Sequence, residues 1–331
     1  MTPSTPTAAT PTFDPQGSRY DLSTYAGRVR HFLDVIDPRS LAYSAERVGR
    51  ASALLREHAA GRALPPGTTD ADLWDALKVR QAVINPGTGE PIPPPARMSA
   101  FVPMNVPILF GMLASTSATG GVFWQVVNQS YNSMLNYANR SGSDVSAGEL
   151  AESYAVAVST AVALSYGVNT LGRRGPAPVR ALVRRVPFLV PYLAVAGAGA
   201  ANVYASRRAE VLNGVPVFDA QGERVGVSRE AAKMGVYKTI LTRSLGLPLP
   251  VLVLPPLVAG AVVPANATRA TRVAFDLVII TACLAGALPL TIAAFPQQME
   301  LDVAALEPEF RALRDRVTGA PVLKLYANKG L

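Results

Sequence analysis

Five long stretches of this chain carry no charged residue, and this feature constrains the fold most strongly. The uncharged stretches are Met98–Asn139, Ser153–Gly172, Val186–Ser206, Ser244–Thr268 and Leu277–Met299. Each is at least as long as the roughly 20 residues that an α-helix needs to cross a bilayer core of about 30 Å. A helix of a soluble protein keeps one polar face in water and seldom leaves such a length uncharged. The sequence therefore predicts an all-α membrane protein with several transmembrane helices.

Charged residues are scarce and are concentrated outside these stretches. They make up 16% of the 331 residues, compared with about 25% in typical soluble domains. The net charge of +8 does not indicate nucleic-acid binding, because residues 1–97 hold 11 basic and 10 acidic residues and no basic face dominates there. Basic residues beside apolar stretches instead orient a chain in a membrane. We expect a lipid bilayer and a small molecule as partners, and no nucleic acid.

The residues that hold metals or perform covalent catalysis are few. Cys283 is the single cysteine, and His31 and His58 are the two histidines. This is too few for a zinc cluster, an iron–sulfur centre or an intrachain disulfide. The sequence contains no Ser–His–acid set, HExxH motif or phosphate-binding loop. We therefore expect no metal, no cofactor and no enzymatic activity.

Composition divides the chain into four regions. Residues 1–17 are rich in Thr, Pro and Ala and are predicted to be disordered. Residues 18–97 are predicted to form a soluble helical region, which ends in the stiff, proline-rich segment Pro91–Pro95. Residues 98–296 are predicted to form the transmembrane domain, and residues 297–331 form a charged C-terminal tail.

The transmembrane domain is predicted to contain five spans and one additional helix. The predicted spans cover residues 101–119, 151–171, 186–205, 239–263 and 273–295. The first uncharged stretch is too long for one span, so Gly120 and Gly121 are expected to separate the first span from a different helix over residues 122–139. The segment Ala196–Ala201, with Gly197 and Gly199, offers a small-residue surface for close helix contact.

The helix predicted over residues 122–139 carries a stripe of amide side chains. Gln125, Asn128, Asn132, Asn136 and Asn139 recur at the spacing of one helix face. Two interpretations remain open. The helix lies flat at the bilayer surface, or it is a re-entrant or pore-lining element whose amides contact a polar solute.

Prolines punctuate the predicted spans. Those predicted to break helices are Pro103, Pro107, Pro187, Pro191, Pro255, Pro256 and Pro289. A proline lacks the backbone N–H and disturbs the preceding turn, and within a membrane the freed carbonyls need a partner or a hydrated cavity. Transporters use interrupted helices to bind solutes, so we interpret the set of prolines as functional.

Basic residues in the loops predict the orientation in the membrane. The connection between the second and third spans contains Arg173, Arg174, Arg180, Arg184 and Arg185 and no acidic residue. The connection between the fourth and fifth spans contains Arg269 and Arg272. With five spans, both connections share the side of the N-terminus. The positive-inside rule then predicts the N-terminus inside, in the cytosol or matrix, and the C-terminus outside.

Short strings spread over the whole chain match those of a known family. The matching strings are Arg19-Tyr20-Asp21, His31-Phe32, Asp37-Pro38-Arg39, Arg97-Met98-Ser99, Val102-Pro103-Met104-Asn105, Phe123-Trp124-Gln125, Asn128-Gln129-Ser130-Tyr131-Asn132, Asn136-Tyr137, Gly214-Val215-Pro216-Val217, Phe295-Pro296-Gln297 and Asn328-Lys329-Gly330-Leu331. Together, and in this order, they resemble the sideroflexins. The amide-rich string is the most recognisable block of that family.

The resemblance implies a five-span carrier of the mitochondrial inner membrane, with its N-terminus in the matrix and its C-terminus in the intermembrane space. It also implies transport of small neutral amino acids, serine foremost, which supplies one-carbon metabolism in the matrix. Older family names point to tricarboxylates and iron. A carboxylate-rich substrate should need basic residues inside the membrane, however, and the uncharged stretches contain none. The alternative function is a non-transporting scaffold or assembly factor for respiratory complexes.

One string departs from the family pattern. Sideroflexins usually carry His-Pro-Asp-Thr-Gly-Glu before the first span, whereas this chain reads Asn85-Pro86-Gly87-Thr88-Gly89-Glu90. Asn-Pro-Gly still favours a turn, so we expect a structural turn here. Glu90 and Asp276 are the candidates for ion or proton coupling, although pairing with Arg272 is the favoured role of Asp276.

Amides are the side chains available to a solute inside the membrane. A serine zwitterion presents a carboxylate, an ammonium and a hydroxyl group, and an amide can donate to the first and accept from the second. The predicted substrate-binding residues are Asn105, Gln125, Asn128, Gln129, Asn132, Asn136, Asn169 and Asn202. We expect the amide stripe and the proline-interrupted first span to form the solute site.

Overall fold

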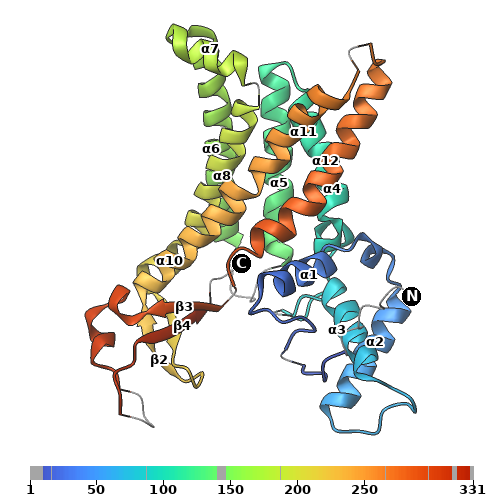
Figure 1. Ribbon diagram of the computed structural model, residues 1–331, viewed down its shortest axis with the longest axis vertical. Helices are drawn as coiled ribbons and strands as arrows, with labels where there is room; N and C mark the ends of the chain where they lie inside the picture. Colours follow the sequence, from blue (N-terminus) through green and yellow to red (C-terminus); the bar gives the residue numbers. More distant parts are fainter. Residues whose placement is uncertain are drawn as a thin grey trace, which may run out of the picture. The chain divides into compact units, whose positions relative to one another are not determined.

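The computed structural model describes residues 10–15, 17–86, 88–139, 147–186, 188–264, 266–296, 298–314 and 319–328. The chain divides into two compact units, whose helices and strands are labelled in Figure 1. Unit 1 comprises Met1–Met104 with Met134–Ser143, and unit 2 comprises Asn105–Ser133 with Asp144–Leu331. The fold agrees with the predicted all-α membrane class, to which a small β-sheet is added.

The helices of unit 1 begin at side-chain caps. Its elements are α1 (Tyr25–Val35), η1 (Pro38–Ala42), α2 (Ala45–Ala59), α3 (Asp70–Val83), η2 (Pro94–Ala96) and η3 (Met98–Ala100). Thr24, Asp37, Ser44 and Thr69 each accept a hydrogen bond from a backbone N–H in the first turn of the helix that follows. Such caps satisfy donors that a helix cannot satisfy itself, and they fix where these helices start.

The core of unit 1 includes a residue from the segment predicted to be disordered. The ring of Phe13 is buried, with its centroid 5.0 Å from that of His58 and 4.9 Å from that of Trp74. The backbone N–H of Phe13 donates to Asp70 Oδ1, and Trp74 Nε1 donates to the carbonyl of Pro11. The predicted boundary at residue 17 is therefore wrong, because this aromatic side chain packs on α2 and α3. Residues 1–9 lie outside the described part of the chain.

The string from Asn85 to Glu90 forms a closed turn. The backbone N–H of Asn85 donates to the carbonyl of Glu90 at 2.9 Å, and that of Gly89 donates to the carbonyl of Asn85 at 2.8 Å. Gly89 has a φ of 73°, a conformation that favours glycine. The Asn85 side chain is 3% exposed and donates from Nδ2 to the carbonyl of Ala138. The expected structural turn is confirmed for the described residues, which exclude Gly87.

Unit 2 contains the long apolar helices. Its helices after the first uncharged stretch are α6 (Ala147–Arg174), α7 (Ala177–Arg185), α8 (Leu189–Ser206), α9 (Arg208–Asn213), α10 (Arg229–Thr239), the π-helical η4 (Ile240–Gly246), α11 (Pro248–Val262) and α12 (Arg269–Ile292). Four helical segments among the described residues are long and apolar enough to cross a membrane: Ala151–Arg174, Leu189–Ser206, Arg229–Val262 and Arg269–Ile292. They correspond to the last four of the five predicted spans.

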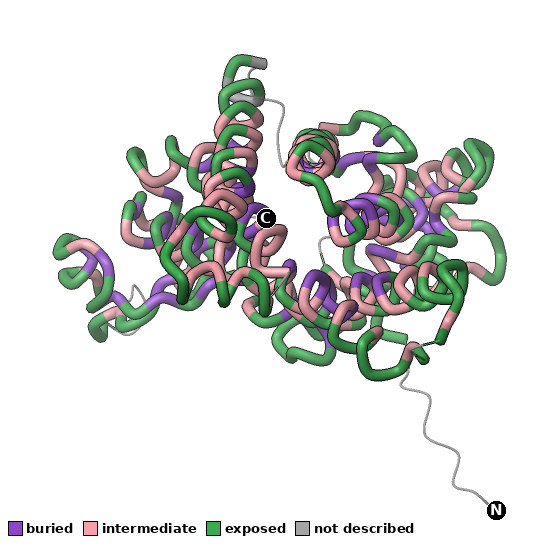
Figure 2. The backbone as a smooth tube through the Cα atoms, turned by 90° about the horizontal axis from the view of Figure 1, so that it is seen from above, coloured by how far each residue is buried: buried purple, intermediate pink, exposed green. Residues whose placement is uncertain are grey.

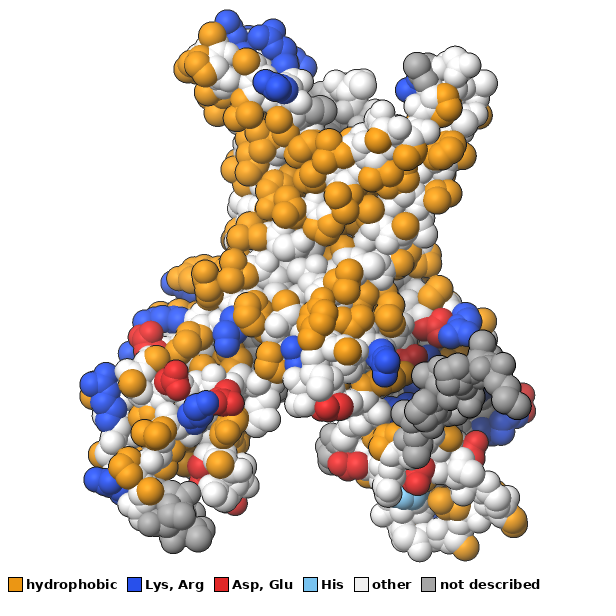
Figure 3. Space-filling model, in the orientation of Figure 1, with side chains coloured by type: hydrophobic (Ala, Val, Ile, Leu, Met, Phe, Trp, Pro, Cys, Tyr) orange, Lys and Arg blue, Asp and Glu red, His pale blue; other side chains and the backbone are white. Residues whose placement is uncertain are grey.

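The outer surface of these helices is apolar. Only 17% to 28% of the most apolar part of each candidate span is buried within the protein, and Figure 2 shows many exposed and intermediate positions along the helices. Tyr166, Leu257 and Val278 are more than half exposed. In Figure 3, hydrophobic side chains cover the long helices, with few charged groups among them. An apolar surface of this extent fits a lipid environment.

Helices α6 and α8 pack closely through small residues. Five alanines of these helices are at most 3% exposed: Ala157, Ala161, Ala194, Ala196 and Ala198. A Cβ added at Gly197 would lie 2.2 Å from Leu164 Cδ1 of α6. On another side of α8, a Cβ added at Gly199 would lie 3.1 Å from Ser244 Oγ of η4. The missing Cβ atoms allow the close approach, so the predicted small-residue surface is confirmed.

The first uncharged stretch forms two helices, α4 (Phe101–Ala114) and α5 (Ala118–Ala138). The break lies at residues 115–117, so the predicted divide at Gly120 and Gly121 is wrong. Both glycines lie inside α5, because Ser117 caps it: the N–H of Gly120 donates to Ser117 Oγ, and the N–H of Gly121 donates to its carbonyl. With 14 residues, α4 is shorter than the roughly 20 that a span needs, whereas α5 has 21.

Helices α4 and α5 form a hairpin that leaves unit 1 and returns to it. The hairpin begins in unit 1, residues 105–133 belong to unit 2, and α5 ends in unit 1. Asn139 follows α5 directly and donates from Nδ2 to the carbonyl of Ala96, which precedes α4, at 2.9 Å. The bond from Asn85 to Ala138 holds the same end of the hairpin.

The helices continue through the prolines that were predicted to break them. Pro103 and Pro107 lie within α4, Pro191 within α8, Pro255 and Pro256 within α11, and Pro289 within α12. Pro187 lies outside the described residues. None of these prolines ends a helix. Pro103 and Pro191 lie in the first turn of their helices, where a backbone N–H has no acceptor within the helix, whereas each proline farther inside removes the donor for the carbonyl four residues earlier. The helix type changes instead at η4, which buries Thr242 and Ser244.

The predicted C-terminal tail contributes two strands to a β-sheet. β1 (Val215–Phe218) pairs with β2 (Arg224–Ser228), and β3 (Gln298–Asp302) pairs with β4 (Lys324–Asn328). β1 also meets β4, which gives an antiparallel sheet of strand order β2-β1-β4-β3. Apolar residues of the sheet form one core with Ala231 and Ala232 of α10. The described part of the tail is therefore integral to unit 2.

Glu307 caps α10 from a distant part of the chain. Its carboxylate accepts hydrogen bonds from Ser228 Oγ at 2.7 Å and from the N–H groups of Arg229 at 2.7 Å and Glu230 at 3.2 Å. Burial alone would raise the pKa of Glu307, but these hydrogen bonds outweigh it and hold the pKa below its ordinary value. A carboxylate at a helix N-terminus satisfies free N–H groups, so this cap joins the segment after β3 to α10.

We expect Glu307→Gln to lower the free energy of unfolding at pH 7 by about 1 kcal/mol. Because the folded-state pKa is depressed, the stabilisation is present above the ordinary pKa of 4.5 and is lost as the pH falls below it. Thermal unfolding measured over this range should show the variant and the wild type converging in acid. Glu309→Gln, at an exposed neighbour, is the control, and an equal effect of both substitutions would contradict the assigned cap.

Candidate functional site

One face of α5 carries buried amide groups. Gln125, Asn128 and Gln129 are 2%, 3% and 2% exposed, respectively. Residues three and four apart lie on the same side of a helix, so these amides form one surface, and Phe123 on another side is 58% exposed. Burying amides without full hydrogen bonding is costly. The burial favours the interpretation of α5 as an element packed among helices over that of a flat surface helix.

Contacts with α4 and α6 position this face. A Cβ added at Gly111 of α4 would lie 2.0 Å from Trp124 Cε2, so the indole ring of α5 packs directly on the α4 backbone. On the α6 side, Ser130 Oγ and Tyr154 OH are 2.9 Å apart and form a hydrogen bond. A glycine on α4 therefore makes room for the tryptophan of α5. With contacts to both α4 and α6, α5 lies packed between helices of unit 2.

Three buried polar atoms on α5 have no hydrogen-bond partner among the described residues. They are Gln125 Oε1, Asn128 Nδ2 and Tyr131 OH. A buried polar group left without a partner costs about 1–3 kcal/mol of stability. Most buried polar groups in native proteins therefore bond to protein or to ordered water. The three atoms therefore keep unused hydrogen-bonding capacity that water or a polar solute could satisfy.

The three atoms are chemically complementary. The amide oxygen of Gln125 accepts a hydrogen bond, the amide nitrogen of Asn128 donates one, and the hydroxyl of Tyr131 can do both. This set can bind an ammonium, a carboxylate and a hydroxyl without supplying net charge, because α5 contains no charged residue. Neutral groups bind a zwitterion less tightly than charged side chains of opposite sign would. Such moderate binding suits a solute that must also be released.

The other predicted amides differ in their surroundings. Asn105 is 5% exposed within α4, and Asn132 is half-buried on α5. Asn136 is exposed and belongs to unit 1. Asn169 donates from Nδ2 to a backbone carbonyl one turn earlier in α6, and Asn202 is half-buried on α8. The bond of Asn169 is local to α6.

The two predicted coupling residues lie on elements other than α5. Glu90 is exposed in the turn after α3, in unit 1. Asp276 is half-buried on α12, one turn after Arg272. Tyr131, by contrast, was not predicted as a site residue, although it is only 4% exposed. Its position three residues after Asn128 is the signal that could have identified it.

Metal-binding side chains are not gathered anywhere in the described ranges. Those residues contain no group of three or more His, Cys, Asp or Glu that could hold a metal ion. Cys283 is a free, half-buried cysteine on α12. The candidate site is therefore built from amides and one hydroxyl.

Comparisons with known proteins agree with the resemblance noted in the sequence. A family model described as Sideroflexins matches residues 14–331. Sideroflexin-5 of Homo sapiens is 39% identical over 308 residues, which cover 90% of this chain and 89% of the relative. Sideroflexin of Dictyostelium discoideum is 37% identical, with 97% and 98% covered, and Sideroflexin-3 of Mus musculus is 36% identical, with 96% and 97% covered. No solved structure matches the chain.

Proposed function

Because this chain belongs to the sideroflexin family, we propose that it is a carrier of the mitochondrial inner membrane that moves small neutral amino acids, L-serine above all. Its transport supplies serine to one-carbon metabolism in the matrix. Family membership supports the mitochondrial carrier role. The choice of substrate rests on the chemistry of the buried face of α5.

The observation that carries the proposal is the pair of opposite, unpartnered amide atoms on α5. The ammonium of serine binds to Gln125 Oε1, the carboxylate binds to Asn128 Nδ2, and the hydroxyl contacts Tyr131 OH. The buried protein groups and the solute then form hydrogen bonds with each other. These bonds offset the free-energy cost of removing both from water. A tricarboxylate fits this face poorly, because α5 offers no positive charge to three carboxylates.

A second candidate function is a membrane scaffold for respiratory complexes. The packed helices of unit 1 and the β-sheet of unit 2 favour it, since both are folded and lie outside the candidate spans. A scaffold, however, has no use for unpartnered polar atoms between apolar helices. Solute flux separates the two functions directly.

The test is uptake of labelled L-serine by liposomes that contain only the purified protein. We expect time-dependent uptake well above that of empty vesicles, competition by unlabelled L-alanine, and little competition by citrate. Folding of the reconstituted protein is checked by thermal unfolding in the same preparation. A folded protein that moves no serine would refute the carrier and leave the scaffold.

We also propose an orientation that differs from the one predicted with five spans. Four helical segments are candidate spans, and the hairpin of α4 and α5 returns to the unit from which it starts, so the chain crosses the bilayer an even number of times. Within unit 2, α7 lies at the end opposite the β-sheet (Figure 1), and it carries Arg180, Arg184 and Arg185. The positive-inside rule then puts α7 in the matrix and both termini in the intermembrane space.

Single cysteines report this orientation. In a Cys283→Ala background, Arg30→Cys, Glu309→Cys and Arg184→Cys place one thiol in unit 1, one after β3 and one on α7. In sealed vesicles of one orientation, we expect an impermeant maleimide to label the first two together and the third only from the other side. Labelling of Arg30→Cys and Arg184→Cys from one side would restore the five-span arrangement.

A further inference from the structure

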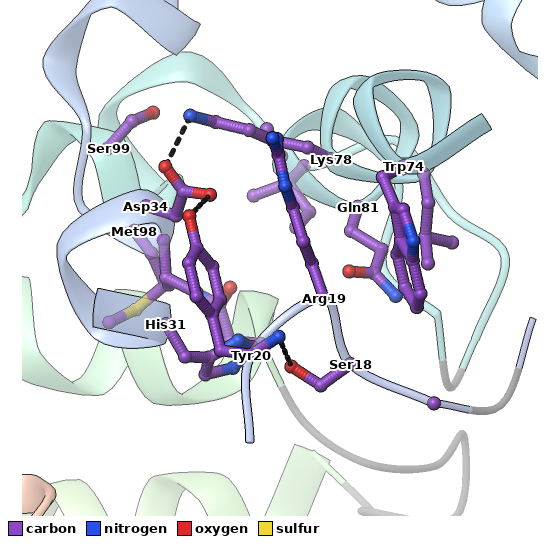
Figure 4. Close-up of a pocket in the computed structure, with 16 residues that line it drawn as sticks. Ser18, Arg19, Tyr20, His31, Asp34, Trp74, Lys78, Gln81, Met98 and Ser99 are labelled. Atoms are coloured by element: carbon purple, nitrogen blue, oxygen red, sulfur yellow. Dashed lines mark hydrogen bonds and ion pairs between the residues drawn. The ribbon is translucent and has the colours of Figure 1, made fainter. Parts of the chain in front are cut away.

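Unit 1 contains a cavity of ≈ 120 Å³ that the proposed transport does not use (Figure 4). Its lining is mixed: Trp74 and Leu77 contribute apolar surface, and Tyr20, Asp34 and Lys78 contribute polar surface. An engineered protein cavity of about 150 Å³ holds benzene, which has six non-hydrogen atoms. The cavity of unit 1 therefore accommodates a ligand of about five or six non-hydrogen atoms.

The acidic group at the cavity is already paired. Asp34 Oδ1 accepts from Lys78 Nζ at 2.8 Å, and Asp34 Oδ2 accepts from Tyr20 OH at 2.7 Å (Figure 4). Lys78 Nζ is also 3.2 Å from Asp37 Oδ2. Both oxygens of Asp34 are thus engaged and its charge is balanced. A cationic ligand would have to displace Lys78 or Tyr20 to bind there.

The remaining polar lining includes the amides of Gln81 and Asn139, which donate and accept, and three further groups that can donate to an anion. Ser99 lines the cavity and is 1% exposed, and its Oγ has no hydrogen-bond partner among the described residues. Arg19 lines the cavity as well and forms no salt bridge with the part of the chain that the structure describes. His31 is the third group. Burial lowers the pKa of its imidazole, and this effect outweighs the nearby negative charge of Asp34, which raises it. The ring is therefore neutral near pH 7 and offers one N–H.

We propose that this cavity binds a small carboxylate with a short apolar tail. The carboxylate binds to the guanidinium of Arg19 and the hydroxyl of Ser99, with His31 as a further donor, and the tail packs on Trp74. An anion with two acceptor oxygens satisfies these donors through charge-assisted hydrogen bonds, which are roughly twice as strong as neutral ones. The site lies outside the candidate spans and stands whether or not the protein transports serine.

Propionate and propionamide are matched probes for this site, because they have the same shape and differ in charge. The chain has two tryptophans, so full-length protein with Trp124→Phe reports the environment of Trp74 alone by fluorescence. We expect a saturable change with propionate and at least about tenfold weaker binding of propionamide. Calorimetry on the unsubstituted full-length protein makes the same comparison and does not depend on how the variant folds.

Substitutions assign the binding to the named donors. Arg19→Gln is expected to weaken propionate binding by about tenfold or more, and Ser99→Ala by severalfold. Arg30→Gln is the control, since Arg30 is an exposed arginine of α1 that does not line the cavity. The proposal is overturned by equal binding of the two probes, by equal losses in Arg19→Gln and Arg30→Gln, or by the absence of saturable propionate binding to folded protein.

Discussion

The double substitution Gln125→Leu with Asn128→Leu is expected to reduce L-serine uptake at least about a hundredfold in proteoliposomes. A hydrogen bond to a charged group is worth about 1.5–3 kcal/mol, so losing one such bond weakens binding about tenfold or more. The double variant loses one bond to the ammonium and one to the carboxylate, and the two factors multiply. The initial rate of labelled serine uptake measures the effect. The same variant should be at least as stable as the wild type, because both substitutions remove buried amides that lack a full set of partners.

The combination of lost transport and retained stability distinguishes a binding role from a packing role. Thr119→Leu is the matched control, because Thr119 is an exposed position of the same helix. It introduces the same side chain without touching the amide face, and we expect uptake close to that of the wild type. Normal serine uptake by the folded double variant would remove the amides from the mechanism.

The second large effect is expected at Gly111, where α4 meets α5. Gly111→Leu places a side chain where the Trp124 ring already lies, since even the first added carbon would be 2.0 Å from Cε2. Overpacking of a helix contact costs about 1–3 kcal/mol, and the backbone of α4 and the indole ring leave little room for relaxation. We expect a loss at the upper end of this range, or failure to fold, measured by thermal unfolding in detergent.

Two further variants test whether the contact with Trp124 is the cause. Gly286→Leu, on α12, is the control, because a Cβ there meets nothing within 4 Å, and its stability should change little. Trp124→Ala combined with Gly111→Leu should recover part of the stability, because removal of the indole makes room for leucine. Equal losses at Gly111 and Gly286 would contradict the packing that positions the amide face.

The membrane helices could be predicted because the bilayer imposes a fixed length and excludes charge. The stretches between Ser153 and Met299 matched the four candidate spans for this reason. The amide stripe was predictable as one face because the spacing of Gln125 and Asn128 follows helix geometry. Which amides are buried was not predictable, because this depends on how α4 and α5 pack through the contact between Gly111 and Trp124.

Elements that depend on distant partners were missed. β3 and β4 lie in a segment that resembles a charged tail, and their pairing with β1 becomes visible only in three dimensions. The break before Gly120 depends on a cap by Ser117 that competes with the flexibility of two glycines. Prolines such as Pro107 did not end helices, because packing in the folded chain holds the helix on both sides of a single missing hydrogen bond.

The most direct test of the amide face is whether water and serine reach it inside the membrane. In the Cys283→Ala background, Asn132→Cys puts a single thiol on α5 one turn after Asn128, beside the amide face and without removing any of its three binding groups. We predict that a small, charged, water-soluble thiol reagent modifies this cysteine in intact proteoliposomes and that L-serine slows the reaction. A thiol that reacts only after the protein is unfolded, or at a rate that serine does not change, would contradict a hydrated solute site on α5.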